Sequence, residues 1–142
     1  IIFGILLGLA DHFGKQTKAY EDMSLRDAIL VGCAQALALI PGTSRSGSTM
    51  TAARALGYTR VESARFSFLL AIPAVAGAGL LAALDLADAT AQMQQDALVT
   101  GILTFFAALA TMMFLMNFLK KASMLVFVIY RVLLGSALLL FL

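Results

Sequence analysis

The sequence is poor in the residue types that form disulfides, metal centres and nucleic-acid interfaces. Its single cysteine, Cys33, excludes an internal disulfide and a cysteine-based metal site. Its single histidine, His12, ends an apolar segment, and we interpret it as an ordinary interfacial residue rather than a metal ligand or a catalytic base. A basic stripe with interleaved aromatic residues is also absent, which argues against nucleic-acid binding.

Charge is scarce as well, since charged residues make up 13% of the 142 and hydrophobic residues 61%, with a mean hydropathy of +0.94. A soluble domain of this size does not need so much apolar surface, so we expect a single all-α integral membrane domain over residues 1–142. Residues 1–10 are apolar but lack an initiator Met and a basic lead, so they differ in form from a signal peptide. Because a bilayer span takes about 20 residues, we interpret them as the end of a cut transmembrane helix, and the chain as the C-terminal part of a longer protein.

Local features predict how the first helices pack and begin. Gly4 and Gly8 form a small-residue face suited to close helix packing. Ser24 is expected to cap the next helix, with Asp27 at the third helical position.

A polar stretch at residues 41–49, Pro-Gly-Thr-Ser-Arg-Ser-Gly-Ser-Thr, separates two apolar segments. Pro41 fixes its own φ angle and disfavours a helical Ile40, so the preceding helix is expected to end there. Gly42 and Gly47 allow unusual backbone angles and the close approach of a ligand. The pattern predicts two short helices around a polar tip.

The residues of this tip suit a phosphate. We interpret Ser46 as the N-cap of the second short helix, whose amides then converge with Arg45 and neighbouring hydroxyls on a small volume. An arginine at the bilayer centre costs about 2.5–3.5 kcal/mol, so Arg45 is a stronger candidate for a binding role than for a structural one. The hydroxyls of Ser44, Ser46, Ser48 and Thr49 are candidate ligand contacts, with caps and turn formers as the alternative.

Other candidates lie outside the tip. Arg131 would also lie at membrane depth, where it either joins the anion site or pairs with a carboxylate elsewhere, a snorkelling arginine being the alternative. Gln35 serves either the site or a hydrogen bond between helices. Phosphoryl transfer usually needs a carboxylate besides a charge clamp, but all carboxylates fall in or beside loops: Asp11, Glu21, Asp22, Asp27, Glu62, Asp85, Asp88 and Asp96.

Charge placement predicts the path through the membrane. We expect transmembrane helices over about residues 61–84, 97–119 and 123–142, with Arg54, Arg60 and Arg65 marking the cytoplasmic boundary. If residues 24–57 double back as a re-entrant pair, the basic residues share one side and the acidic loop after the first long helix lies opposite, as the positive-inside rule requires. The basic residues are Lys15, Lys18, Arg60, Lys120 and Lys121.

Residues 41–49 resemble the second signature of the bacterial undecaprenyl pyrophosphate phosphatases, or bacitracin-resistance phosphatases, which reads Pro-Gly-x-Ser-Arg-Ser-x-x-Thr. The surroundings agree: Gly-Cys-Ala-Gln at 32–35, Phe-Ser-Phe-Leu-Leu-Ala-Ile-Pro at 66–73, and Tyr130-Arg131. The resemblance implies a multi-pass enzyme of the bacterial cytoplasmic membrane that hydrolyses undecaprenyl pyrophosphate. Such enzymes recycle the lipid carrier of peptidoglycan synthesis and confer bacitracin resistance. The implied fold is an inverted repeat with two re-entrant helix pairs, of which this chain holds one half.

Carried over by this resemblance, Arg45 would clamp the pyrophosphate, and Ser44, Ser46 and Thr49 would hydrogen-bond its oxygens. The family uses Mg²⁺ or Ca²⁺, but its first signature, with paired glutamates, has no counterpart here. The metal ligands are therefore expected in a missing N-terminal repeat, and this chain alone is expected to be inactive. Further substrate contacts are assigned to Pro41, Gly42, Thr43, Gly47, Ser48, Gln35 and Arg131.

Two rival functions remain open from the sequence. Broken helices at the membrane midplane are also typical of transporters, so a carrier of an anion or a polyprenyl phosphate is the alternative. A structural bundle without a site is the third reading, against which Arg45 at depth argues. The expected partners are a polyprenyl pyrophosphate, the lipid bilayer and the missing repeat, with a homo-oligomer left open.

Overall fold

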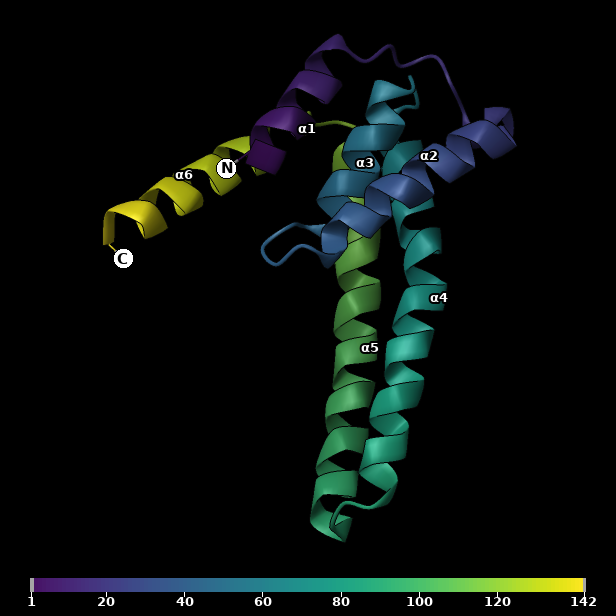
Figure 1. The fold of residues 1–142 in the computed structure, drawn as a ribbon, viewed down its shortest axis with the longest axis vertical. Helices are drawn as coiled ribbons and strands as arrows, with labels where there is room; N and C mark the ends of the chain where they lie inside the picture. The colour runs from purple at the N-terminus through teal and green to yellow at the C-terminus, as the bar shows by residue number, and fades with distance from the viewer. Residues whose placement is uncertain (1, 142) are drawn as a thin grey trace.

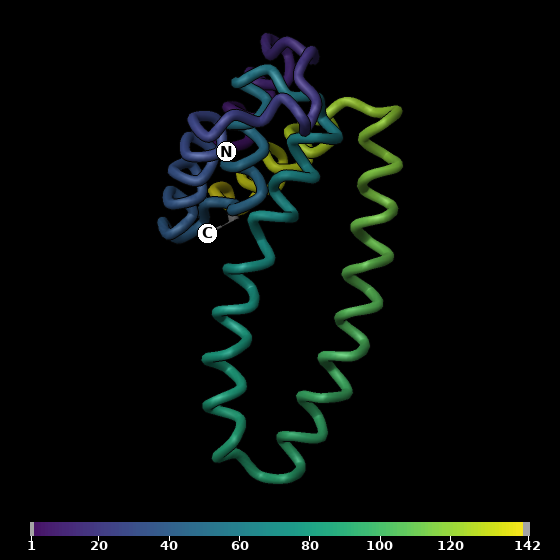
Figure 2. Tube along the Cα trace, turned by 90° about the vertical axis from the view of Figure 1, so that its right-hand side faces the viewer, coloured from purple at the N-terminus to yellow at the C-terminus, as the bar shows by residue number. Residues whose placement is uncertain are grey.

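The structure, a computed structural model, describes residues 2–141, which form helices and no β-strand. The expected all-α class is therefore confirmed. Two long helices make a hairpin, and the other elements gather at its open end (Figures 1 and 2). In chain order the elements are α1 (Ile2–Phe13), η1 (Tyr20–Asp22), α2 (Leu25–Ala36), η2 (Leu37–Leu39), α3 (Arg45–Ala55), α4 (Arg60–Ala87), α5 (Ala91–Leu119) and α6 (Leu125–Phe141).

The hairpin helices α4 and α5 are long and apolar enough to cross a membrane, with best-window mean hydropathies of 2.1 and 2.2. Their large apolar side chains are mostly exposed, as is typical of surfaces that lipid or another protein segment covers. α4 continues through Pro73 without a break. α5 begins at Ala91, earlier than the expected start near residue 97, because Thr90 caps it by accepting a hydrogen bond from the amide of Met93.

Helices α2 and α3 form a pair whose two outer ends meet. Ahead of α2, the amides of Thr17 and Lys18 donate to the carbonyl of Gly57, which follows α3. The amide of Thr59 donates in turn to the carbonyl of Lys18 at 3.2 Å. The chain therefore enters and leaves this helix pair at one place, and the polar tip lies at its other end.

The ends of α2 and α3 agree with the sequence predictions in all but one detail. Ser24 accepts from the amide of Asp27 at 3.1 Å, as predicted. Ile40 is extended before Pro41, and Gly42 has a φ of 82°. The N-cap of α3, however, is Ser44 and not Ser46: Ser44 is extended, and its Oγ accepts from the amide of Gly47 at 3.1 Å. The cap lies three residues before the amide that it satisfies, so the prediction was two residues too late.

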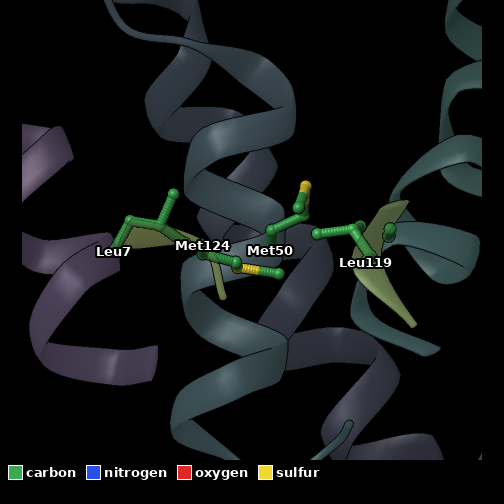
Figure 3. Packing of buried hydrophobic residues seen from close by; sticks show 5 residues of the cluster. Leu7, Met50, Leu119 and Met124 are labelled. Atoms are coloured by element: carbon green, nitrogen blue, oxygen red, sulfur yellow. The ribbon is translucent and has the colours of Figure 1, made fainter. Parts of the chain in front are cut away.

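A small apolar core joins the helices at the open end of the hairpin. Figure 3 shows Leu7 of α1, Met50 of α3, Leu119 of α5 and Met124, just before α6, meeting one another. A second cluster of Val31, Ala53 and Tyr58 lies between α2, α3 and the start of α4.

Helix α1 packs tightly on α6, as its small-residue face predicts. A Cβ added to Gly4 would lie 3.4 Å from the Cβ of Arg131, and one added to Gly8 would lie 3.3 Å from Cγ1 of Val128. These contacts leave little room for a larger side chain on that face of α1. They fix α6, and with it Arg131, beside the tip.

A buried ion cluster fastens α1, α3 and α4 to the segment just before α6. Asp11 of α1 accepts from Nε of Arg54 at 3.0 Å, from Nε and Nη2 of Arg60 at 2.8 and 3.0 Å, and from the amide of Met124 at 3.3 Å. Arg54 is fully buried, and its two Nη atoms donate to carbonyls of Asp11, Gly14 and Tyr58. Arg54 therefore has a structural role, and its expected place at the cytoplasmic boundary stays a prediction.

A second polar cluster, outside the long apolar helices, holds the two ends of the α2–α3 pair together. The hydroxyl of Tyr58 donates to Oδ2 of Asp27 at 2.7 Å, and Nζ of Lys18 lies 2.9 Å from the same oxygen. Burial and the hydrogen bond to Asp27 raise the pKa of Tyr58 to about 12. Hydrogen bonds from Lys18 and Tyr58 hold the pKa of Asp27 below its usual range.

Candidate functional site

The tip of the α2–α3 pair is a tight turn built by three predicted site residues. Pro41 and Gly42 are exposed, and the amide of Thr43 donates to the carbonyl of Ile40 at 3.1 Å. The positive φ of Gly42 is a conformation that a residue with a Cβ rarely adopts, so the turn requires glycine there. This turn delivers the chain to the N-terminus of α3.

Two of the predicted hydroxyls are used by α3 itself. The Oγ of Ser44 caps the helix, and the Oγ of Ser48 lies 3.1 Å from both the Ser44 and the Arg45 carbonyl oxygens. Ser48 is also buried. Ser46 differs, because it is exposed and its Oγ lies 3.4 Å from that of Ser44. Of these three serines, Ser46 presents the hydroxyl that a ligand can reach.

Arg131 lies directly against the first turn of α3. A Cβ placed on Gly47 would be 2.6 Å from Nη1 of Arg131, so the guanidinium occupies the space that the glycine leaves open. Ser46, Gly47 and Arg131 line a cavity of about 120 Å³, whose remaining wall is apolar. Arg131 also lines a second cavity, of about 200 Å³, together with Gly42. The structure thus brings Gly42, Ser46, Gly47 and Arg131 together, although Arg131 is remote from the others in sequence.

Arg45 faces a different cavity. It lines a space of about 360 Å³ with Gln35 of α2 and Ala74 of α4. The Oε1 atom of Gln35 is buried and has no hydrogen-bond partner within the described part of the chain, so one acceptor there remains unsatisfied. Arg45 and Arg131 therefore lie on separate cavities around one tip.

Four of the arginines of the chain fall into two groups by their partners. Arg54 and Arg60 are paired with Asp11, as described above. Over residues 2–141, no hydrogen bond or ion pair engages the guanidinium of Arg45 or of Arg131. Arg26, near the start of α2, has no such partner either, but Arg45 and Arg131 differ from it because they line cavities beside the tip, where an anion would find positive charge.

Thr49 points away from these cavities. It is 1% exposed, and its Oγ1 lies 3.0 Å from the carbonyl oxygen of Arg45, 3.1 Å from that of Ser46 and 2.7 Å from Oγ of Ser67 on α4. The predicted direct contact between Thr49 and a phosphate therefore has no free hydroxyl to make it in this geometry. Ser67 lies in the segment 66–73 that agrees with the family resemblance, but its bond to Thr49 was not predicted, because a serine in an apolar helix carries no local signal of its partner on another helix.

The chain is all-α, and two of its apolar helices are long enough to cross a membrane. Two arginines lie beside the tip between two short helices. These features are typical of a helical membrane protein with a site for an anion. Within that class, the sequence model described as bacitracin resistance protein BacA matches residues 1–137. The chain belongs to this family.

Curated relatives agree with this assignment. An undecaprenyl-diphosphatase of Erythrobacter litoralis is 68% identical over 141 residues, which are 99% of this chain and 50% of the relative. Undecaprenyl-diphosphatase 1 of Rhodospirillum rubrum is 51% identical over 138 residues, or 96% of this chain and 49% of the relative. An undecaprenyl-diphosphatase of Thermomicrobium roseum is 48% identical over 145 residues, with 99% and 51% covered. The chain spans about half the length of the curated relatives it matches.

Proposed function

We propose that the protein to which this chain belongs hydrolyses undecaprenyl pyrophosphate to undecaprenyl phosphate and inorganic phosphate, and that this chain supplies the phosphate-binding side of the site. The family membership and the names of the relatives support the reaction. The observation that carries the role of this chain is the pair of unpaired guanidiniums, Arg45 and Arg131, on either side of one tip.

The proposed chemistry is electrostatic stabilisation of a transferring phosphoryl group. Negative charge on its oxygens must be neutralised as the bond to the leaving phosphate breaks, and preorganised donors do this without reorganising in the reaction. Arg45 and Arg131 provide the charge, while the hydroxyl of Ser46 and the first amides of α3 provide directional donors.

We place the ligands of the Mg²⁺ or Ca²⁺ that the resemblance implies outside the described residues of this chain. No group of three or more His, Cys, Asp or Glu residues lies close enough to hold a metal ion in the part of the chain that the structure describes. Asp11, the carboxylate of the ion cluster, is fully engaged by two arginines and an amide. A metal would therefore be held by residues outside this chain, in the repeat that we propose precedes it.

We further propose that residues 24–57 form a re-entrant pair and that α4 and α5 span the cytoplasmic membrane of a bacterium. The joined outer ends of the pair support a path that returns to the side it came from. The acidic turn between α4 and α5 lies at the far end of the hairpin from Arg60 and Lys120 (Figure 2), which agrees with the positive-inside rule. The exposed apolar faces of the helices would then receive lipid and the polyprenyl tail.

The proposed function is tested by phosphate release from undecaprenyl pyrophosphate in detergent with added Mg²⁺ or Ca²⁺. The whole protein is compared with its Arg45→Ala variant and with Arg65→Ala as the control, because Arg65 is half exposed and its partners, Glu62 in a long ion pair and the Tyr20 ring, are not residues of the tip. We expect release by the wild type, a loss of at least about 100-fold in Arg45→Ala, and near-normal release by the control.

Two outcomes would contradict the proposal. Equal release by Arg45→Ala and Arg65→Ala would remove Arg45 from the site. An absence of release from the wild type, together with substrate-dependent flux in vesicles, would favour the transporter instead.

A further inference from the structure

The bond between Thr49 and Ser67 is the only side-chain hydrogen bond that joins α3 to α4 in the described residues. Its oxygens lie 2.7 Å apart, and both residues are nearly buried, at 1% and 3% exposed. A hydrogen bond shielded from water is stronger than an exposed one, and it is costly to break on one side only. The pair is therefore a firm link between the two helices.

The direction of this link follows from the number of protons. The hydroxyl of Thr49 has one proton, and it lies within hydrogen-bond distance of the carbonyl oxygens of Arg45 and Ser46. When Thr49 donates to these carbonyls, its oxygen is left to accept the proton of Ser67. A chain of hydrogen bonds then runs from α4 through Ser67 and Thr49 to the first turn of α3.

The two carbonyls at the end of this chain belong to the residues that flank the tip cavities. Arg45 lines one cavity and Ser46 the other. α4, from which the chain starts, is fixed at its own N-terminus by the bonds between Arg60 and Asp11. Through this chain of hydrogen bonds, Ser67 holds both site residues in position relative to α4, which is itself fixed.

A second buried serine on α4, Ser63, differs from Ser67 in its hydrogen bonding. Ser63 lies one turn before Ser67 and is fully buried, but its hydroxyl has no hydrogen-bond partner in the described structure. Residues four apart share one face of a helix. Two buried serines therefore follow each other along α4, and of these two Ser67 alone reaches the tip.

We propose that Ser67 is a positioning residue: through Thr49 it holds the first turn of α3, and so places Arg45 and Ser46 for phosphate contact. The inference rests on the proposed hydrolysis and adds a residue to it.

Steady-state kinetics of the whole protein test this role. We expect Ser67→Ala to lower kcat about tenfold to 100-fold, as misplaced catalytic groups do, with a smaller change in KM. Thr49→Val should lose as much, whereas Thr49→Ser keeps the hydroxyl and should stay within about threefold. Because the two residues act as one unit, the double variant Thr49→Val/Ser67→Ala should lose no more than either single variant. Ser63→Ala is the matched control and should retain wild-type rates.

A labelling experiment measures the positioning without hydrolysis. Ser46→Cys, in a background where Cys33 and any other native cysteine are replaced, is alkylated by a water-soluble maleimide. Ser67→Ala should raise the labelling rate several-fold by loosening the first turn of α3, and Ser63→Ala should leave it unchanged. If the wild type released no phosphate, the hydrolysis proposal would fail, and this rate would still decide the role of Ser67.

Two results would overturn the inference. One is a Ser67→Ala variant that equals Ser63→Ala in both kcat and labelling rate. The other is a double variant whose loss is the product of the two single losses, because independent residues do not form a link.

Discussion

Arginines of one chain can have opposite roles, and their partners decide which. Arg54 is fully buried and donates to a carboxylate and to backbone carbonyls, so it holds the fold together. Arg45 and Arg131 have no such partners in the described structure and lie beside the tip cavities. An arginine that satisfies its donors within the protein has none left for a ligand, so we assign binding to the second group.

The contact between Gly47 and Arg131 gives a prediction at this scale. In Gly47→Ala, the new Cβ would lie 2.6 Å from Nη1 of Arg131, so the guanidinium must move away from the tip. The new Cβ would also lie 3.1 Å from the Cβ and Oγ of Ser44, which caps α3, so we expect a modest fall in the unfolding temperature as well. The rate of phosphate release should fall about tenfold or more.

Gly101→Ala is the control for this substitution. Gly101 lies in α5, and apart from the neighbouring backbone of that helix no described atom lies within 4 Å of a Cβ placed there. Both variants gain similar helix propensity, so the contacts of the new Cβ with Arg131 and Ser44 distinguish them. Phosphate release by Gly47→Ala at the rate of Gly101→Ala would argue against a role for the Arg131 contact.

At the scale of elements, the local signals of the sequence predicted most ends of α2 and α3, but not the N-cap of α3 or the contacts of the tip. Pro41 and Gly42 determine their own backbone angles, and Ser24 caps α2 as predicted. The contact between Arg131 and Gly47 could not be predicted, because it depends on the packing of α6 against α1 at Gly4 and Gly8. Local propensity determines where helices begin and end, whereas packing determines which side chains meet.

The polar cluster that joins the ends of the α2–α3 pair predicts a pH dependence. The folded pKa of Tyr58 is raised to about 12, above the unfolded value of about 10. Because the pKa of Tyr58 is higher in the folded state, Tyr58 stabilises the fold at a pH below the pKa of the unfolded state. This stabilisation is lost as the pH rises through the pKa of the folded state. The lowered pKa of Asp27 acts in the opposite sense: its contribution is present above the unfolded value of about 3.9 and is lost in acid, as the pH falls through the folded value.

Ultraviolet difference titration of tyrosinate in wild type and Tyr58→Phe measures this directly. The absorbance that the substitution removes should titrate with a midpoint of about 12. The unfolding temperature of the wild type should also fall more steeply than that of Tyr58→Phe at alkaline pH. A midpoint of about 10, the pKa of a free tyrosine, would mean that Tyr58 does not hold this cluster together.

The whole molecule separates its charges along the hairpin. Lys18 and Arg60 lie at the open end, where the α2–α3 pair begins and ends, and Asp85 and Asp88 lie at the turn between α4 and α5 (Figure 1). Hydropathy and charge order were sufficient to predict the helical class and the two long helices. The side of α3 on which Arg45 and Arg131 each lie could not be predicted, because it depends on contacts between helices that are remote in sequence.

The membrane path that we propose gives a prediction for cysteines placed at exposed positions. Glu21→Cys and Lys121→Cys should react with a membrane-impermeant maleimide only after the cells are permeabilised, and Asp88→Cys should react in intact cells. A re-entrant pair puts the first two positions on one side. Labelling of Glu21→Cys together with Asp88→Cys in intact cells would instead mean that residues 24–57 cross the membrane.

The central claim is that the tip of the α2–α3 pair binds phosphate, and equilibrium binding of a non-hydrolysable diphosphonate analogue of the lipid tests it most directly. The whole protein in detergent is compared with Arg45→Ala, Arg131→Ala and the control Arg65→Ala. Charge-assisted bonds to phosphate are among the stronger polar contacts, so each of the first two variants should lose affinity by about tenfold or more, while the control keeps it. Wild-type affinity in both Arg45→Ala and Arg131→Ala would contradict the account.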